Sequence, residues 1–207
     1  MLGERERIEI ARLWERNLRQ HALQLPLGEC HRNLEPASAE FLCALAAGLG
    51  AKRMLEIGGS SGLSTIALAT AARDVSGRVM SIEREPLRQG EARKALKHLG
   101  LSRFVEFVLG DAGTVLETAG EFDLVLIDCE KADYIRFFDM LHLPAGGTVV
   151  ADNIISHSLA SYVSHVRSRP GVESLTLPIG KGLELTRFST PTHPDRASAS
   201  GSAAGKL

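Results

Sequence analysis

Residues 54–72 read MLEIGGSSGLSTIALATAA, and three structural patterns meet in this stretch. Met54–Ile57 is an apolar run that is typical of a buried strand. Gly58–Gly62 is a loop of glycine and serine, and a helix is predicted from Leu63 to Ala72. A strand, a glycine loop and a helix in this order predict the first βα unit of a parallel sheet.

The alternation of strands and helices continues along the chain. Further strands are predicted over residues 78–82, 104–109, 123–127 and 147–151, and a helix from about Pro86 to Leu99. Their largely apolar character suits strands that are buried on both faces and linked by right-handed crossovers. Two more strand-like runs, 173–177 and 183–188, flank a turn-rich segment and predict an antiparallel hairpin. We therefore expect an α/β fold, a doubly wound and mostly parallel sheet with a C-terminal antiparallel hairpin.

Two helices are predicted ahead of the sheet. The first has an apolar stripe at helical spacing, made of Ile8, Ala11, Trp14, Leu18, Ala22 and Leu25. This stripe either packs on the domain, covers a ligand as a lid, or forms a dimer contact. The second helix is predicted to begin near Pro36, with a buried side made of Phe41, Leu42, Leu45 and Leu49.

The expected organisation is a single domain over residues 1–188, with N-terminal helices in 1–50 and the α/β core in 51–188. Residues 189–207 are mostly Ser, Thr, Pro, Ala and Gly, which predicts a disordered tail. The three cysteines, Cys30, Cys43 and Cys129, are too sparse for a disulfide framework. A charged N-terminus and the lack of a run of about 18 apolar residues predict a cytoplasmic protein without a membrane partner. The net charge of −1 gives no indication of nucleic-acid binding.

Acidic or glycine residues follow each of the five predicted parallel strands. They are Glu56 to Gly62, Glu83, Gly110-Asp111, Asp128 and Asp152-Asn153. In open α/β sheets, ligands bind beyond the carboxyl ends of the strands. This edge of the sheet is therefore the expected binding site. Its expected outer walls are the first helix, the loop Cys30–Asn33 and the segment after Asn153.

The glycine loop has the spacing G-x-x-x-G rather than G-x-G-x-x-G, which weighs against a nicotinamide-dependent dehydrogenase. Glu83 follows Glu56 by 27 residues, and a carboxylate there can accept both hydroxyls of an unsubstituted ribose. Asp111 can accept from the amino group of an adenine. The alternatives without a ligand are a simple strand–helix turn for the loop and a helix-capping role for Glu83.

With these motifs the chain resembles the class I S-adenosylmethionine methyltransferases. More narrowly, it resembles the small metal-dependent O-methyltransferases of the catechol and caffeoyl-coenzyme A type, over about residues 36–188. The matching segments are Leu55–Thr65, Ile82-Glu83, Gly110–Ala112, Leu126–Tyr134, Val150–Asn153 and Gly182-Leu183. The most specific part is the spacing Asp128-x-x-Lys131-x-x-Tyr134 together with Asp152-Asn153.

The resemblance implies a Rossmann-like methyltransferase fold, S-adenosylmethionine as cofactor, and a divalent metal, foremost magnesium. The implied cofactor-binding residues are Glu56, Gly58, Ser60, Gly62, Ser64, Glu83, Asp111 and Asp128. The implied metal ligands are Asp128, Asp152 and Asn153, which agrees with the preference of magnesium for oxygen ligands. Lys131 is the implied general base, because a nearby metal ion and the sulfonium both disfavour its protonated form. The implied acceptor is a small hydroxylated molecule, a diol or a catechol, and a homodimer is compatible with the family.

Some features keep other readings open. Where the family often has Ala-Asp, this chain has Cys129-Glu130, and we expect Cys129 to be a packing residue. Where the family usually has an apolar pair and a tryptophan, this chain has Ile154–His157, so a more open site or another diol is expected. His157 follows Asn153 by four residues and could face the metal, and we expect it either at the surface or behind the metal ligands. The alternatives are an N-methyltransferase, whose Asn/Asp-Pro-Pro-Tyr/Phe run is absent, and a cofactor-binding protein without catalytic activity.

Overall fold

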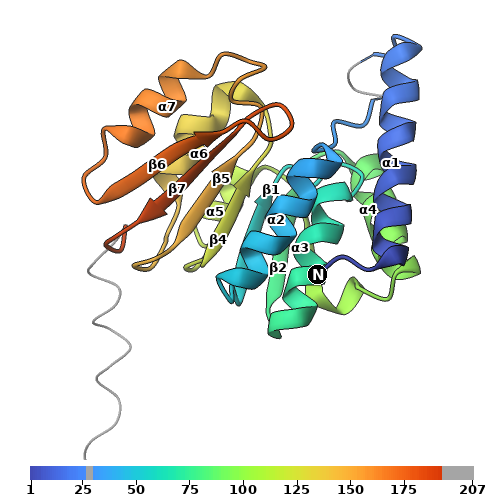
Figure 1. Cartoon of the computed structure of the whole chain (residues 1–207), viewed down its shortest axis with the longest axis horizontal. Coiled ribbons are helices and arrows are strands. Elements are labelled where there is room, and N and C mark those ends of the chain that lie inside the picture. Colours follow the sequence, from blue (N-terminus) through green and yellow to red (C-terminus); the bar gives the residue numbers. More distant parts are fainter. Residues whose placement is uncertain (27–29, 193–207) are drawn as a thin grey trace, which may run out of the picture.

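The computed structural model describes residues 1–26 and 30–192 (Figure 1). A seven-stranded sheet runs through the centre with the strand order β3-β2-β1-β4-β5-β7-β6. The strands are β1 Arg53–Ile57, β2 Arg78–Glu83, β3 Val105–Leu109, β4 Leu124–Ile127, β5 Thr148–Ala151, β6 Val172–Leu177 and β7 Leu183–Phe188. The first five are parallel, whereas β7 pairs antiparallel with β5 and with β6. The predicted α/β fold and its C-terminal hairpin are thus confirmed.

The strand order reverses beside β1. From β1 the chain proceeds to β2 and β3 on one side, and then returns to build β4 and β5 on the other. Ile57 at the end of β1 therefore lies opposite Ile127 at the end of β4. Such a switch point opens a crevice between the loops that follow the two strands.

Helices cover both faces of the sheet (Figure 1). One face carries α1 Glu4–Ala22, α2 Pro36–Gly48, α3 Leu63–Val75 and α4 Pro86–His98. The other carries α5 Ala112–Leu116, α6 Tyr134–Met140 and α7 Ala160–Arg167. Short 3-10 turns occupy Ser102–Phe104 and Lys131–Asp133. A hydrophobic core lies on each face of the sheet. Along β4, Leu124 and Leu126 pack into the core under α1–α4, and Val125 and Ile127 pack into the core under α5–α7, as expected for a strand buried on both faces.

The packing of α1 differs from the sequence prediction. Ile8 is 62% exposed and Leu18 50% exposed, so most of the predicted apolar stripe does not pack on the domain, although Trp14 contacts the core. The buried face instead includes Ile10, Leu13 and Asn17. Asn17 is buried because its side-chain oxygen accepts a hydrogen bond from the backbone N–H of Asn33, 3.2 Å away. A buried polar residue is tolerated on this inner face because it has a hydrogen-bond partner.

The packing of α2 needs a smaller correction. Its buried positions are Ser38, Ala39, Leu42, Cys43 and Ala46. Phe41 and Leu45 are only partly buried, and Leu49 is 47% exposed. The small residues face inward because α2 packs closely against α3, which leaves little room for larger side chains.

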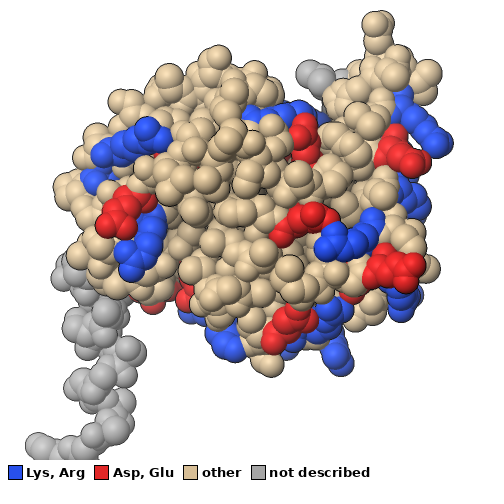
Figure 2. Space-filling view, viewed as in Figure 1, with Lys and Arg blue, Asp and Glu red and all other residues tan. Residues whose placement is uncertain are grey.

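Part of the predicted tail is described. Thr192 donates its backbone N–H to the carbonyl of Leu143 at 3.0 Å, and its hydroxyl accepts from the N–H of Leu143 at 2.9 Å. The remainder of that predicted tail, residues 193–207, lies outside the described residues. Within the described ranges, no helix is long and apolar enough to span a bilayer. In the face shown in Figure 2, basic and acidic side chains are interspersed.

Candidate active site

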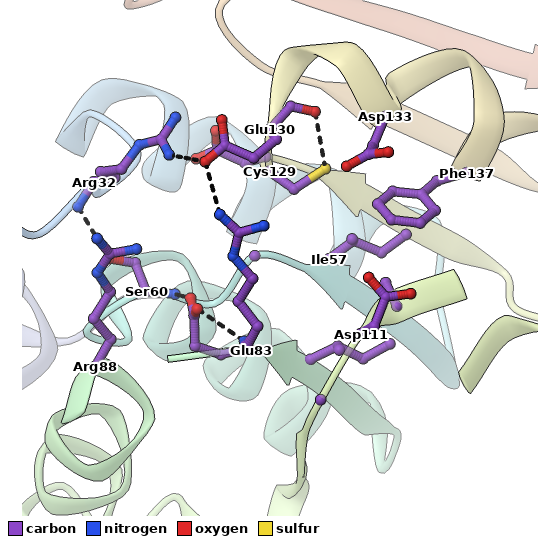
Figure 3. Close-up of a pocket in the computed structure, with 16 residues that line it drawn as sticks. Arg32, Ile57, Ser60, Glu83, Arg88, Asp111, Cys129, Glu130, Asp133 and Phe137 are labelled. Atoms are coloured by element: carbon purple, nitrogen blue, oxygen red, sulfur yellow. Dashed lines mark hydrogen bonds and ion pairs between the residues drawn. The ribbon is translucent and has the colours of Figure 1, made fainter. Parts of the chain in front are cut away.

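A pocket opens at the carboxyl ends of the parallel strands (Figure 3). Its empty volume is about 590 Å³, which includes the open space at its mouth. Five of the predicted site residues line it, namely Gly58, Ser60, Glu83, Asp111 and Asp128. They come from four different strand ends, so the convergence expected from the topology is present.

Gly58 brings the ends of β1 and β4 together. Its φ is +97°, and a Cβ at this position would lie 2.1 Å from the carbonyl oxygen of Asp128. Only glycine fits a left-handed conformation with a neighbouring backbone so close. The floor of the pocket is therefore backbone, which a ligand can approach directly.

Gly62 has a different role from the one predicted. It does not line the pocket, and a Cβ there would lie 2.9 Å from Cα of Ala92 in α4. Its φ of +98° starts α3 in close contact with α4. The sequence spacing could not separate a glycine needed for helix packing from one that faces a ligand.

The Glu83 carboxylate is fixed by backbone donors. One oxygen accepts from the N–H of Ser60 at 2.7 Å, and the other accepts from the N–H groups of Arg84 at 2.9 Å and Glu85 at 3.0 Å. The side chain is buried yet lines the pocket. Because a carboxylate oxygen can accept more than one hydrogen bond, Glu83 can hold the start of α4 and still receive a ligand hydroxyl.

Glu56 lies beneath the pocket rather than in its wall. One carboxylate oxygen accepts from Thr65 at 2.6 Å and from Ser81 at 2.5 Å. The other oxygen is buried without a hydrogen-bond partner in the described chain. Burial raises the pKa of Glu56, and the neighbouring hydroxyls of Ser64, Ser81 and Thr65 oppose this effect. Glu56 and Ser64, both predicted to bind the cofactor, thus form a buried pair with one acceptor unused.

Asp128, Asp152 and Asn153 lie together after the adjacent strands β4 and β5. The Asn153 amide donates to Asp128 Oδ1 at 3.4 Å and to Asp152 Oδ2. Asp152 Oδ1 is buried without a partner in the described chain. Burial, followed by the nearby charge of Asp128, raises the pKa of Asp152 to about 7. Two close carboxylates with an unused oxygen fit a divalent cation, and rotating the Asn153 amide by 180° would present a third oxygen.

Lys131 is held at the edge of this trio. Its Nζ lies 3.2 Å from Asp128 Oδ1 and donates to the hydroxyl of Tyr134 at 2.7 Å. The Tyr134 hydroxyl donates in turn to the carbonyl of Asp152 at 3.2 Å. The Tyr134 ring is fully buried and packs edge-to-face on Tyr162. Tyr134 therefore supports Lys131 from below. Burial raises the pKa of the Tyr134 hydroxyl well above its ordinary value.

The structure adds a group that the sequence did not indicate. Glu130 Oε1 accepts from Arg32, which precedes α2, and from Arg84 at 3.2 Å, which follows β2 (Figure 3). These three residues line the pocket and join segments that are far apart in the sequence. Only Arg32 lies in a loop predicted as a wall. An ion pair between distant segments leaves no periodic pattern in a sequence.

Three further positions complete the site. Asp111 caps α5 by accepting from the N–H of Gly113 at 2.8 Å, and its side chain is 58% exposed. Cys129 lines the pocket, and burial raises the pKa of its thiol to about 12, which keeps it protonated and unreactive near neutral pH. His157 is exposed, with Nδ1 2.8 Å from the hydroxyl of Ser156.

The chain is similar to proteins of known family. Residues 9–188 match the family model described as O-methyltransferase. The catechol O-methyltransferase of Mycobacterium tuberculosis is 40% identical over 120 residues, which cover 56% of this chain and 54% of that protein. The match thus spans about half the length of that relative. Caffeoyl-CoA O-methyltransferase 2 of Petunia hybrida is 28% identical over 179 residues, covering 72% of this chain and 73% of that protein. The crystal structure of cofactor-bound Rv0187 from MTB has a TM-score of 0.74 and 27% identity, covering 88% of this chain and 90% of that one.

Proposed function

The chain belongs to the O-methyltransferase family, and from this membership we propose that it transfers the methyl group of S-adenosylmethionine to a hydroxyl of a small catechol-like diol, with assistance from a divalent metal ion. The observation that carries the proposal is the meeting of Lys131 with Asp128, Asp152 and Asn153 beside the pocket. The cofactor, the metal and the proton acceptor then each have a distinct place.

The cofactor would lie along the pocket. Glu83 would accept from the ribose hydroxyls, and Asp111 from the adenine amino group. The backbone at Gly58 and Ser60 would border the methionine part. The unused oxygen of Glu56 fits the ammonium group of that methionine, directly or through a water, because a buried acceptor without a donor is costly.

The metal would be held by Asp128, Asp152 and Asn153, with magnesium the best match to an all-oxygen set. When bound, it supplies positive charge that lowers the pKa of the acceptor hydroxyl beside it. Asp152 Oδ1, which is buried and unpaired, is the oxygen that gains most from such an ion.

Lys131 would act as the general base. Its Nζ is held between Asp128 and the Tyr134 hydroxyl, so the position of its lone pair, once the amine is neutral, is restricted. The amine takes the proton of the acceptor hydroxyl. The oxygen then attacks the methyl carbon in line with the sulfur, the carbon–sulfur bond breaks, and the sulfonium becomes a neutral thioether. Positioning of the two reactants accounts for much of the expected rate.

The test is methyl transfer from labelled S-adenosylmethionine to catechol, with magnesium or with a chelator. Lys131→Met should lower kcat by about 100-fold or more, as expected for loss of a general base. Lys97→Met, at the exposed end of α4, is the matched control and should retain activity. Transfer to catechol that persists with the chelator would contradict the metal-assisted reaction and favour a metal-independent O-methyltransferase. Cofactor binding without transfer to any acceptor would favour a catalytically silent protein.

A further inference from the structure

The turn between β6 and β7 is fixed beside the predicted metal ligands. The N–H of Ile154 donates to the carbonyl of Gly182 at 3.0 Å. The N–H groups of Ile155 and Ser156 donate to the carbonyl of Lys181 at 3.1 and 3.2 Å. These donors directly follow Asn153, so the backbone of Lys181 is tied to the segment that leaves the trio.

The same turn is clamped from its other side. A Cβ at Gly180 would lie 2.5 Å from the hydroxyl of Ser38 and 2.8 Å from Glu35 Oε2, at the start of α2. A Cβ at Gly182 would lie 2.5 Å from Ile155 Cγ1. The turn therefore packs closely between the start of α2 and residues 154–156, and backbone hydrogen bonds hold the point from which the Lys181 side chain starts.

Charged side chains from several segments surround one space here. Burial lowers the pKa of His157, and the positive charges of Lys131, Lys181 and Arg32 lower it further, while Asp128 raises it. The four charged groups come from the loop before α2, the segment after β4 and the β6–β7 turn, and all of them act on the turn that follows Asn153.

Two of the three cations in this region have a carboxylate partner. Arg32 is paired with Glu130, and Lys131 with Asp128. The ammonium of half-buried Lys181 forms no ion pair or hydrogen bond with a residue in the described ranges 1–26 and 30–192. The Lys181 ammonium is therefore a positive charge that a ligand anion could pair with.

We propose that the acceptor carries a carboxylate in addition to its two adjacent hydroxyls, and that Lys181 binds this carboxylate and sets the preference for acidic acceptors. The inference rests on the proposed function, because it assumes that the diol lies at the trio. A charge-assisted hydrogen bond from Lys181 would stabilise a bound carboxylate more than it would stabilise a neutral ester.

The experiment compares 3,4-dihydroxybenzoate with its methyl ester, two ligands that differ in one charge. Binding is measured by calorimetry in the presence of S-adenosylhomocysteine and magnesium, so no turnover is required. The wild type should bind the acid about tenfold more tightly than the ester. Lys181→Met should abolish this preference while leaving the ester affinity within about twofold, and Lys181→Arg should keep the preference. Unchanged ester binding also shows that the variant is folded.

Each other outcome has a defined meaning. Equal binding of acid and ester by the wild type, or an equal loss of both in Lys181→Met, overturns the inference. A Lys181-dependent preference without any methyl transfer supports the inference and contradicts the proposed reaction. Methyl transfer to acid and ester with equal kcat/KM supports the reaction and overturns the inference. Binding of neither ligand contradicts both.

Discussion

Replacing Gly58 by alanine tests whether the close approach of β1 and β4 builds the site. The left-handed φ of +97° should cost an alanine about 1–2 kcal/mol. The new Cβ would lie 2.1 Å from the carbonyl oxygen of Asp128 and 2.8 Å from its carbonyl carbon. Backbone cannot swing aside as a side chain does, and overpacking of this kind costs about 1–3 kcal/mol. The expected loss in the free energy of unfolding is therefore about 2–5 kcal/mol.

The displaced group belongs to a predicted metal ligand. Because a shift of about 1 Å in a catalytic group can cost about 100-fold in rate, kcat/KM should fall by about that factor. Urea unfolding gives the stability, and calorimetry with S-adenosylhomocysteine gives cofactor affinity. Gly100→Ala is the matched control, since Gly100 has a φ of +71° with nothing within 4 Å of its Cβ position. If Gly58→Ala bound cofactor normally and lost no more stability than Gly100→Ala, the contact with Asp128 would not be what shapes the site.

Three further outcomes are expected. Magnesium should raise the melting temperature of the wild type but not of Asp152→Ala, and an equal rise in both would place the ion elsewhere. Glu130→Gln should weaken S-adenosylhomocysteine binding by no more than about fivefold, because its pairs with Arg32 and Arg84 are partly exposed; a loss of 100-fold in calorimetry would mean direct contact with the cofactor. Burial lowers the pKa of His31 below 6.5, so the unfolded chain binds its proton more readily. Above pH 6.5 this group should thus have no effect on the free energy of unfolding, and as the pH is lowered below 6.5 the free energy of unfolding should decrease. The decrease should be less steep in His31→Gln. Parallel curves for the two proteins in urea titrations would refute this account.

The strands and the hairpin could be predicted because their signals are local. Apolar runs that end in glycine or acidic residues predicted the bounds of the five parallel strands to within a residue or two. The inner face of α1 could not be predicted, since burial of Asn17 and Glu6 depends on Asn33 and Arg73, far away in the sequence. Hydrophobic periodicity records which residues avoid water and not which polar residues find a buried partner.

The candidate site divides in the same way. Glu83, Asp111 and Asp128 line the pocket because strand order alone brings strand ends together. Glu56 lies below the wall, although one residue separates it from Gly58. Alternation along β1 turns Glu56 toward α3 and Ile57 toward the opposite face, so its place depends on register.

The three backbone donors on Glu83 set a constraint for protein engineering. An effort to make this pocket accept cofactor analogues enlarged at the ribose would naturally begin by shortening Glu83. That change would also release the N–H groups of Ser60, Arg84 and Glu85, loosening the glycine loop and the entry to α4 together. Asp111 holds only one backbone donor and is mostly exposed, so the adenine end is the better place to redesign selectivity. Analogues enlarged at the adenine end can be accommodated without breaking the hydrogen bonds that hold the glycine loop and the start of α4.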